Sequence, residues 1–162
     1  MATTERTLTI HDVVGSEPPV AIRAAIAAWL LAVGAGVAES VLGVIDAISD
    51  GSMPPAAIVA QVGFRAIVYG GLFVVIDKYF RLGRNWSRHL LAGLLGVVGM
   101  ATLVIGPIQW LLDGADFGAI ELSPGFFAFA VIRSVHVMAV VTGVVLMYQP
   151  DANRWFRARR SH

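Results

Sequence analysis

Apolar residues fill four long stretches of the chain, and most charged residues lie between them. The stretches cover residues 21–48, 56–76, 90–112 and 126–148. Each can cross a hydrocarbon core about 30 Å thick as a helix, which requires about 20 residues. None alternates between polar and apolar positions, as the strands of a membrane barrel do. Because a helix satisfies its own backbone hydrogen bonds in lipid, we predict an all-α, polytopic membrane protein with four transmembrane helices in an up-down bundle.

The segments around these stretches divide the chain into three parts. Residues 1–19 are mixed polar and lack the basic start, short apolar run and small-residue cleavage site of a signal peptide. Residues 20–149 hold the four stretches, and prolines break the chain just before the second and the fourth. Residues 150–162 are rich in arginine. We therefore predict an N-terminal tail, a four-helix transmembrane domain and a basic C-terminal tail.

Positive charge gathers on one side of the predicted membrane. The basic residues of this side are Lys78, Arg81, Arg84 and Arg88 between the second and third stretches, and Arg154, Arg157, Arg159 and Arg160 near the C-terminus. The two loops on the other side carry Asp50, Asp116 and Glu121 but no lysine or arginine. Lysine and arginine mark the cytoplasmic side of membrane proteins. We predict a multi-pass protein of the plasma membrane with both termini in the cytoplasm.

The composition agrees with a membrane protein and excludes several other classes. Of the 162 residues, 57% are apolar and 14% are charged, whereas a soluble domain has about 45–50% and about 25%. The mean hydropathy is +0.73. A net charge of +1 indicates no nucleic-acid partner. With no cysteine, the chain has no disulfide, thiol nucleophile or cysteine-bound metal.

Polar side chains inside the stretches carry the strongest functional signal, because an ionised residue at the centre of a membrane helix costs about 2.5–3.5 kcal/mol. Each stretch has one polar stripe at helical spacing. The stripes are Glu39 and Asp46, then Gln61, Arg65 and Tyr69, then Thr102, Gln109 and Asp113, and finally Arg133 and His136. All four are concentrated in the outer halves of their helices. We predict that they line a polar pocket in the outer half of the bundle.

The donors in these stripes outnumber the acceptors. The donors that Glu39 alone cannot satisfy favour an anionic or carbonyl-bearing ligand, a lipid headgroup or the carboxylate of a partner. The predicted ligand-binding residues are Arg65, Arg133, Gln61, Tyr69 and Gln109. The alternative is a set of buried ion pairs that orient the four helices and bind nothing. The nearby arginines oppose a bound cation, so we expect no metal and no cofactor.

Three classes of function fit this pattern. The first is a protein that binds a lipophilic or anionic small molecule, or an accessory subunit of a larger membrane complex or homo-oligomer. The second is a small enzyme that performs cyclisation, isomerisation or epoxide opening on a lipophilic substrate, with Glu39, Asp46 and His136 as catalytic acid–base groups. The third is a small transporter. We favour the first class, because the chain carries no catalytic signature.

Two further patterns concern how the helices pack. Ala32, Gly36 and Ser40 form a ridge of small residues, which lets helices approach closely within the bundle or between copies. Pro107 interrupts the hydrogen bonds of the third helix, and we expect it to expose a carbonyl group to the pocket. Arg65 precedes Asn85 by 20 residues and Arg133 precedes Asn153 by 20, which suggests two duplicated helical hairpins with both arginines at similar depth.

Two segments beside the apolar stretches carry a resemblance to known proteins. They are RLGRNWSR, at residues 81–88, and YQPDANRWF, at residues 148–156. Both resemble segments of a loose group of uncharacterised small four-helix integral membrane proteins of high-GC actinobacteria. One lysine against eleven arginines also suits a high-GC source. The resemblance implies a bacterial plasma membrane and the same four helices, and it brings no functional residues with it.

Overall fold

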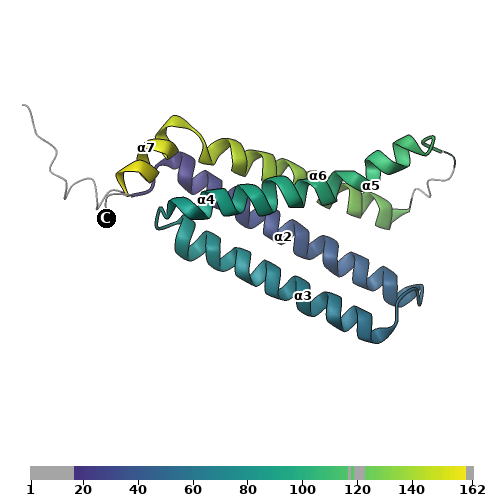
Figure 1. The fold of residues 1–162 in the computed structure, drawn as a ribbon. Helices are drawn as coiled ribbons and strands as arrows, with labels where there is room; N and C mark the ends of the chain where they lie inside the picture. Colours follow the sequence, from purple (N-terminus) through teal and green to yellow (C-terminus); the bar gives the residue numbers. More distant parts are fainter. Residues whose placement is uncertain (1–16, 117, 119–122, 160–162) are drawn as a thin grey trace, which may run out of the picture.

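A computed structural model describes residues 17–116, 118 and 123–159 of the chain. Helix α2 (Val20–Ser49) is followed by α3 (Pro55–Val74), which continues into the π-helical η1 (Val75–Phe80). Next come α4 (Asn85–Leu91), the π-helical η2 (Ala92–Gly99) and α5 (Met100–Leu112), which form one continuous rod. Helices α6 (Pro124–Met147) and α7 (Pro150–Ala158) complete the described part (Figure 1). The predicted tail at residues 1–19 lies mostly outside the described residues.

Four of these rods are long and apolar enough to cross a membrane. They are Val20–Ser49, Pro55–Phe80, Asn85–Leu112 and Pro124–Met147. The prediction of an all-α protein with four membrane-spanning helices is therefore confirmed. The largest difference is at the third rod, which begins at Asn85 and not at residue 90. Its first turn is polar, so an apolar pattern alone does not reveal it.

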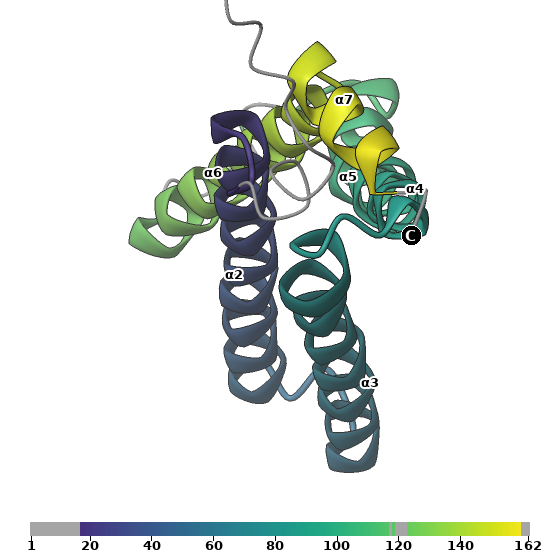
Figure 2. The same cartoon turned by 90° about the vertical axis from the view of Figure 1, so that its left-hand side faces the viewer.

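Helix α2 lies at the centre of the fold. More than half of its most apolar part is buried, against less than a quarter in each of the other three rods. It packs most extensively against α6 and next against α3. Figures 1 and 2 show α2 and α3 running side by side, whereas α5 and α6 leave them in different directions toward the end away from α7. The rods are therefore closest at the end that carries α7.

Small residues allow α2 and α6 to approach closely. Ala32 and Gly36 of the predicted ridge are buried in this interface, so the ridge packs within the bundle. On α6, a Cβ atom added to Gly143 would lie 2.8 Å from Cε2 of the fully buried Trp29. Glycine is therefore required at this position for the indole ring to lie flat against α6.

Helix α7 docks against the turn between η1 and α4. The Phe80 and Phe156 rings lie 5.3 Å apart, and Arg88 Nη2 donates a hydrogen bond of 2.6 Å to Asn153 Oδ1. Gly83 adopts a φ of +78°, and a Cβ there would lie 3.1 Å from the Trp155 ring. The predicted C-terminal tail thus includes a helix, because its aromatic face packs on the core. The two segments that carry the resemblance contact each other here.

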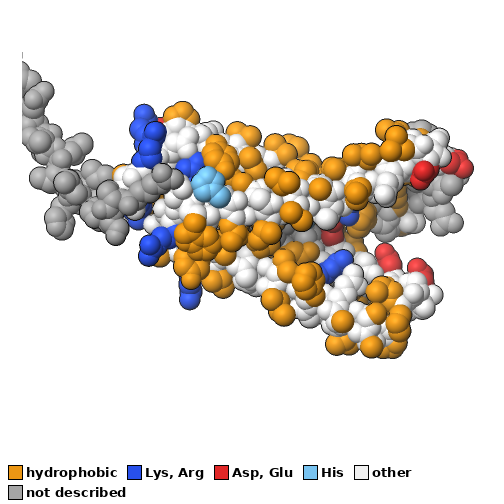
Figure 3. Space-filling model, viewed as in Figure 1, with side chains coloured by type: hydrophobic (Ala, Val, Ile, Leu, Met, Phe, Trp, Pro, Cys, Tyr) orange, Lys and Arg blue, Asp and Glu red, His pale blue; other side chains and the backbone are white. Residues whose placement is uncertain are grey.

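Charged side chains separate along the length of the molecule. Lysine and arginine gather at the end near α7, which we call the basic end, and carboxylates gather at the opposite, acidic end (Figure 3). The acidic end carries Asp50, Asp113 and Asp116 in its loops. This separation matches the charge pattern of the sequence. That the basic end faces the cytoplasm stays a prediction.

The α2–α6 contact gives a test of the fold. We expect Gly143→Ala to destabilise the protein by about 1–3 kcal/mol, because the added methyl group overpacks the Trp29 ring. Gly70→Ala is the matched control, since a Cβ at Gly70 meets nothing within 4 Å. Thermal unfolding in detergent, followed by tryptophan fluorescence, measures both variants. Equal losses of stability in the two variants would contradict the proposed packing.

Candidate functional site

Three of the predicted site residues form a cluster between α2 and α6. Arg133 Nη2 donates to Glu39 Oε2 at 3.1 Å, and His136 Nδ1 lies 3.2 Å from Glu39 Oε1. Both carboxylate oxygens therefore have a partner. The side chains of Glu39 and His136 are only 11% and 10% exposed, and that of Arg133 is 28% exposed. We call these three residues the Glu39 cluster.

Local geometry explains why the cluster forms. Arg133 and His136 are three residues apart on α6, so both reach the face that packs on α2. Gly36 lies nearly one turn before Glu39 on α2, and a Cβ there would be 3.2 Å from His136 Cε1. The missing side chain of Gly36 therefore makes room for the imidazole beside the carboxylate.

Arg133 also joins the cluster to α5. Its Nη1 donates a hydrogen bond of 3.0 Å to the backbone oxygen of Leu103. In a regular helix that oxygen would accept from the residue four positions later, but Pro107 has no N–H group. The carbonyl that Pro107 was expected to expose is therefore present, and the arginine binds it. Arg133 lies 4.7 Å above the centre of the Phe129 ring as well.

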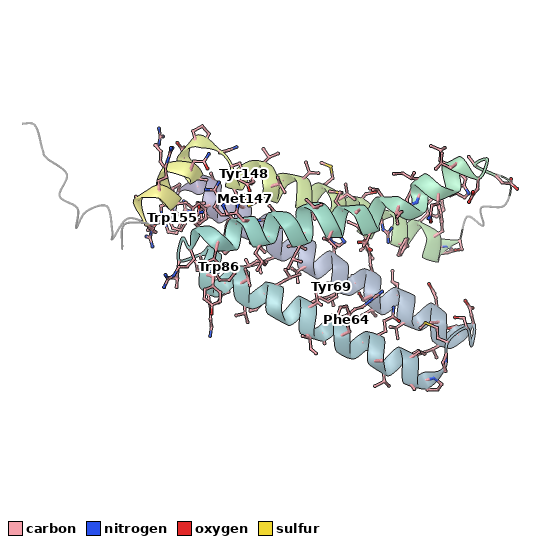
Figure 4. All side chains as sticks on the ribbon, in the orientation of Figure 1. Phe64, Tyr69, Trp86, Met147, Tyr148 and Trp155 are labelled. Atoms are coloured by element: carbon pink, nitrogen blue, oxygen red, sulfur yellow. The ribbon has the colours of Figure 1, made fainter. Side chains whose placement is uncertain are left out.

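Two hydroxyl groups link α3 to α2 next to the cluster. The hydroxyl groups of Tyr69 and Ser40 lie 3.0 and 2.7 Å from the backbone oxygen of Gly36, within hydrogen-bond distance. The two hydroxyl oxygens are 3.0 Å apart. Figure 4 labels Tyr69 on α3, beside α2. These contacts hold the two helices together at the level of the Glu39 cluster.

A groove of about 480 Å³ lies between α2 and α3 on the acidic side of this link. We call it the α2–α3 groove. Its lining consists of Val37, Ser40, Val41, Val44 and Ile45 from α2, and of Val62, Arg65, Ala66 and Tyr69 from α3. Arg65 is the only basic residue among these lining residues. The surface of the groove is apolar, and Arg65 borders it with the carbon part of its side chain.

Arg65 and Arg133 have different surroundings although both lie beside residues 37–45 of α2. Arg133 has a carboxylate, a carbonyl and an aromatic ring as partners. Arg65 has no hydrogen bond or ion pair with any residue that the structure describes. Both arginines thus lie beside the same segment of α2, and their similar depth in the membrane stays a prediction. The suggested duplication of hairpins stays a prediction.

The remaining predicted site residues do not join the cluster. Asp46 and Gln109 are exposed, and Gln61 is partly buried. Within the described part of the chain, none of the three makes a side-chain hydrogen bond or an ion pair. The reason is the divergence of the rods toward the acidic end, which separates stripes that share a depth (Figure 1). A common depth in the membrane therefore did not mean a common pocket.

Sequence reasoning did not identify two groups that take part in the site: the Phe129 ring and the Ser40 hydroxyl. Phe129 precedes Arg133 by four residues, a spacing at which helical side chains meet. Ser40 was predicted to matter only for its small size, as part of the small-residue ridge. Its hydroxyl group also contacts the Gly36 oxygen and the Tyr69 hydroxyl.

No protein-family model, curated protein or solved structure matches this chain. The resemblance to small actinobacterial membrane proteins therefore stays a prediction. The chemistry of the site has to be argued from the side chains alone.

The Glu39 cluster and the α2–α3 groove could support different chemistry. In the Glu39 cluster, a carboxylate within hydrogen-bond distance of an imidazole can exchange a proton with it. Its charge, however, is already balanced by Arg133. At the border of the α2–α3 groove, the Arg65 guanidinium can donate to an anion that the described residues do not supply. The groove is therefore the better candidate for ligand binding.

Removal of the Glu39 charge tests whether the cluster stabilises the fold. We expect Glu39→Gln to destabilise the protein by about 3–5 kcal/mol, because it leaves the largely buried Arg133 without a counter-charge. Asp46→Asn, on the same helix, removes the same charge from an exposed side chain and should have little effect. Unfolding in detergent measures both.

A double variant separates charge from packing in this experiment. Glu39→Gln/Arg133→Gln removes both charges, so it should recover part of the stability lost in the single variant. If Glu39→Gln and Asp46→Asn had the same stability, the cluster would not hold α2 and α6 together.

Proposed function

We propose that this chain is an integral protein of a bacterial plasma membrane that binds an anionic amphiphile in the α2–α3 groove. The ligand's acidic group contacts Arg65, and its apolar tail lies along the walls of the groove. The observation that carries this proposal is an arginine that borders an apolar groove and has no hydrogen bond or ion pair with the described residues. The volume of about 480 Å³ falls within the range of small-molecule pockets, about 300–1,000 Å³.

The charges of the bundle support an external anion at Arg65. The nearest buried carboxylate, Glu39, already has Arg133 and His136 as partners. Asp46 forms no ion pair with Arg65 in the structure. An arginine within a membrane helix is costly without a partner. A bound carboxylate or phosphate would offset this cost through charge-assisted hydrogen bonds.

The depth of Arg65 favours a small lipophilic acid over an ordinary bilayer lipid. Arg65 comes ten residues after the first residue of α3, Pro55, which is about 15 Å along the helix. A bilayer phospholipid keeps its headgroup at the surface, whereas a single-tailed acid can sink to this level. The Tyr69–Ser40 contact closes the groove toward the basic end. The tail would then lie against the apolar walls of the groove, which include Val44 and Val62.

Acid–base catalysis on a lipophilic substrate is a second candidate. It is favoured by the distance of 3.2 Å between Glu39 Oε1 and His136 Nδ1. In this case the two residues would exchange the proton, and Arg133 would stabilise the anion that develops. Asp46 is exposed and does not contact this pair. Glu39 would therefore be the only carboxylate available both to donate a proton to the substrate and to accept one from it. The variant Glu39→Gln would abolish turnover but leave binding at Arg65 intact.

A photo-crosslinking experiment tests binding in the groove. The probes are a sixteen-carbon carboxylic acid with a diazirine on its tail and the corresponding alcohol, each added to the full chain in nanodiscs. We expect the acid to label residues 37–45 and 62–69. Arg65→Gln should reduce this labelling about tenfold, because a hydrogen bond to a charged group contributes about 1.5–3 kcal/mol. Arg65→Lys should keep most of it.

The matched control for this experiment is Arg84→Gln. It removes the same charge from an exposed site at the basic end, outside the groove, and should leave labelling unchanged. Tryptophan fluorescence checks that each variant is folded. Equal labelling by acid and alcohol, or full labelling of the folded Arg65→Gln protein, would refute the proposal.

A further inference from the structure

Two aromatic side chains beside the turn between η1 and α4 are left partly uncovered by the bundle. Tyr79 is 40% exposed and Trp86 is 46% exposed. Their ring centroids lie 5.0 Å apart, with the ring planes inclined at 54°. Neither side chain forms a hydrogen bond with any residue that the structure describes, so the phenol O–H and the indole N–H remain available as donors. We call this pair the Tyr79–Trp86 site.

The site lies where two of the membrane-spanning rods end on the same side of the molecule. Tyr79 belongs to the last turn of the rod Pro55–Phe80, and Trp86 to the first turn of the rod Asn85–Leu112. The shorter rod has 26 residues, which corresponds to about 39 Å of helix. A bilayer is about 30 Å thick in its hydrocarbon core and about 40–45 Å thick with its headgroups. These rod ends therefore reach the headgroup layer, where tryptophan and tyrosine are enriched.

Two cationic side chains beside the pair have no acidic partner among the described residues. They are Lys78, next to Tyr79 in the chain, and Arg84, whose backbone N–H donates a hydrogen bond of 3.0 Å to the Tyr79 oxygen. Both residues are exposed, and neither side chain forms an ion pair or a hydrogen bond within the described part of the chain. Asp77, the carboxylate beside Lys78 in the sequence, is bound by Arg81 at 3.0 Å. The site therefore carries two positive charges that no described carboxylate balances.

The fold anchors the turn that carries this site. Gly83 adopts a φ of +78°, which favours glycine and lets the chain reverse between Tyr79 and Arg84. The Gly83 N–H donates a hydrogen bond of 3.0 Å to the Phe80 oxygen. The Phe80 ring is fully buried against Phe156. Because the turn is already ordered, a ligand that binds there has less conformational entropy to offset.

The chemistry of the site suits the headgroup of an anionic phospholipid. A phosphate diester offers negative charge and acceptor oxygens to a lysine and an arginine. The indole N–H and the phenol O–H can donate to the ester oxygens of the same lipid, while the ring faces contact the first carbons of its acyl chains. A soluble anion would meet the charges but would leave the exposed rings uncovered. The combination of charges and rings at this depth therefore favours a lipid.

We propose that the Tyr79–Trp86 site binds the headgroup of an anionic phospholipid, such as phosphatidylglycerol, in the leaflet at the basic end. The phosphate contacts Lys78 and Arg84, and the upper part of the lipid lies against the two rings. Figure 4 shows Trp86 at this end of the molecule. The site is independent of Arg65 and of the amphiphile proposed above.

Quenching of Trp86 by brominated lipids tests this proposal. The full chain is placed in phosphatidylcholine vesicles that contain a small fraction of brominated phosphatidylglycerol or the same fraction of brominated phosphatidylcholine. The signal of Trp86 is the difference between the unmodified chain and Trp86→Phe, which removes the contribution of the other tryptophans, Trp29, Trp110 and Trp155. We expect the site to prefer the anionic lipid about tenfold.

Two charge variants identify the source of this preference. Lys78→Gln/Arg84→Gln should reduce it to about one, and Lys78→Arg/Arg84→Lys, which keeps both charges, should retain it. Both residues are exposed, so these variants should stay folded, which thermal unfolding followed by circular dichroism verifies. The matched control, Arg154→Gln/Arg157→Gln, removes two arginines from exposed positions of α7 at the same end and should leave the preference unchanged.

Three results would overturn the proposal. The first is equal quenching of Trp86 by the two brominated lipids in the unmodified chain. The second is an equal loss of preference in the two glutamine double variants, since diffuse charge would then explain it. The third is displacement of the anionic lipid by glycerol 3-phosphate added to the solution, which would assign the site to a soluble phosphate ester.

Discussion

A carboxylate inside an apolar bundle needs a counter-charge, and in this protein that need ties three helices together. Glu39 on the central helix α2 binds Arg133 and His136 on α6. Arg133 in turn binds the Leu103 oxygen of α5, which Pro107 leaves without a helical partner. One ionic contact thereby orients α6 on α2 and draws α5 to the same point. Breaking such a contact costs far more than an exposed ion pair contributes.

The two ends of the molecule differ in how closely their helices pack. At the basic end, aromatic packing between Phe80 and Phe156 and the Arg88–Asn153 hydrogen bond close α7 over the bundle. Toward the acidic end the rods diverge, and apolar side chains remain uncovered by protein (Figures 1 and 3). In a membrane, lipid covers such side chains at little cost, since lipid tails are as apolar as they are. Several side chains that line the α2–α3 groove, among them Val41, Ile45 and Val62, are exposed there.

Arg65 and Arg133 illustrate how the position of an arginine decides which protein groups it contacts. Arg133 lies where α6 packs on α2 and contacts a carboxylate, a backbone carbonyl and an aromatic ring. Arg65 lies on α3, whose contact with α2 is made through the Tyr69 and Ser40 hydroxyl groups. That contact brings no carboxylate to Arg65. Of two residues with the same charge beside the same segment of α2, one is bound by protein groups and the other has no hydrogen bond or ion pair with the described residues.

Much of this structure could be predicted from the sequence, because local physics controls it. Long apolar stretches form helices in lipid, and their ends follow within one or two turns. The separation of charge between the two ends also follows from the linear order of residues. The same holds for the carbonyl at Pro107, since a missing N–H group is a property of the chain itself.

Which polar stripes meet was decided only by the tertiary structure. The helical period puts Glu39 and Asp46 on one face of their helix, and Gln61 and Arg65 on one face of theirs. It does not specify which face a helix turns toward its neighbour, or the angle between the two helices. Close packing at Gly36 and Gly143 brought His136 and Arg133 to Glu39. Divergence left Asp46 and Gln109 exposed. The docking of α7 depended on contacts between segments far apart in sequence, which no local pattern encodes.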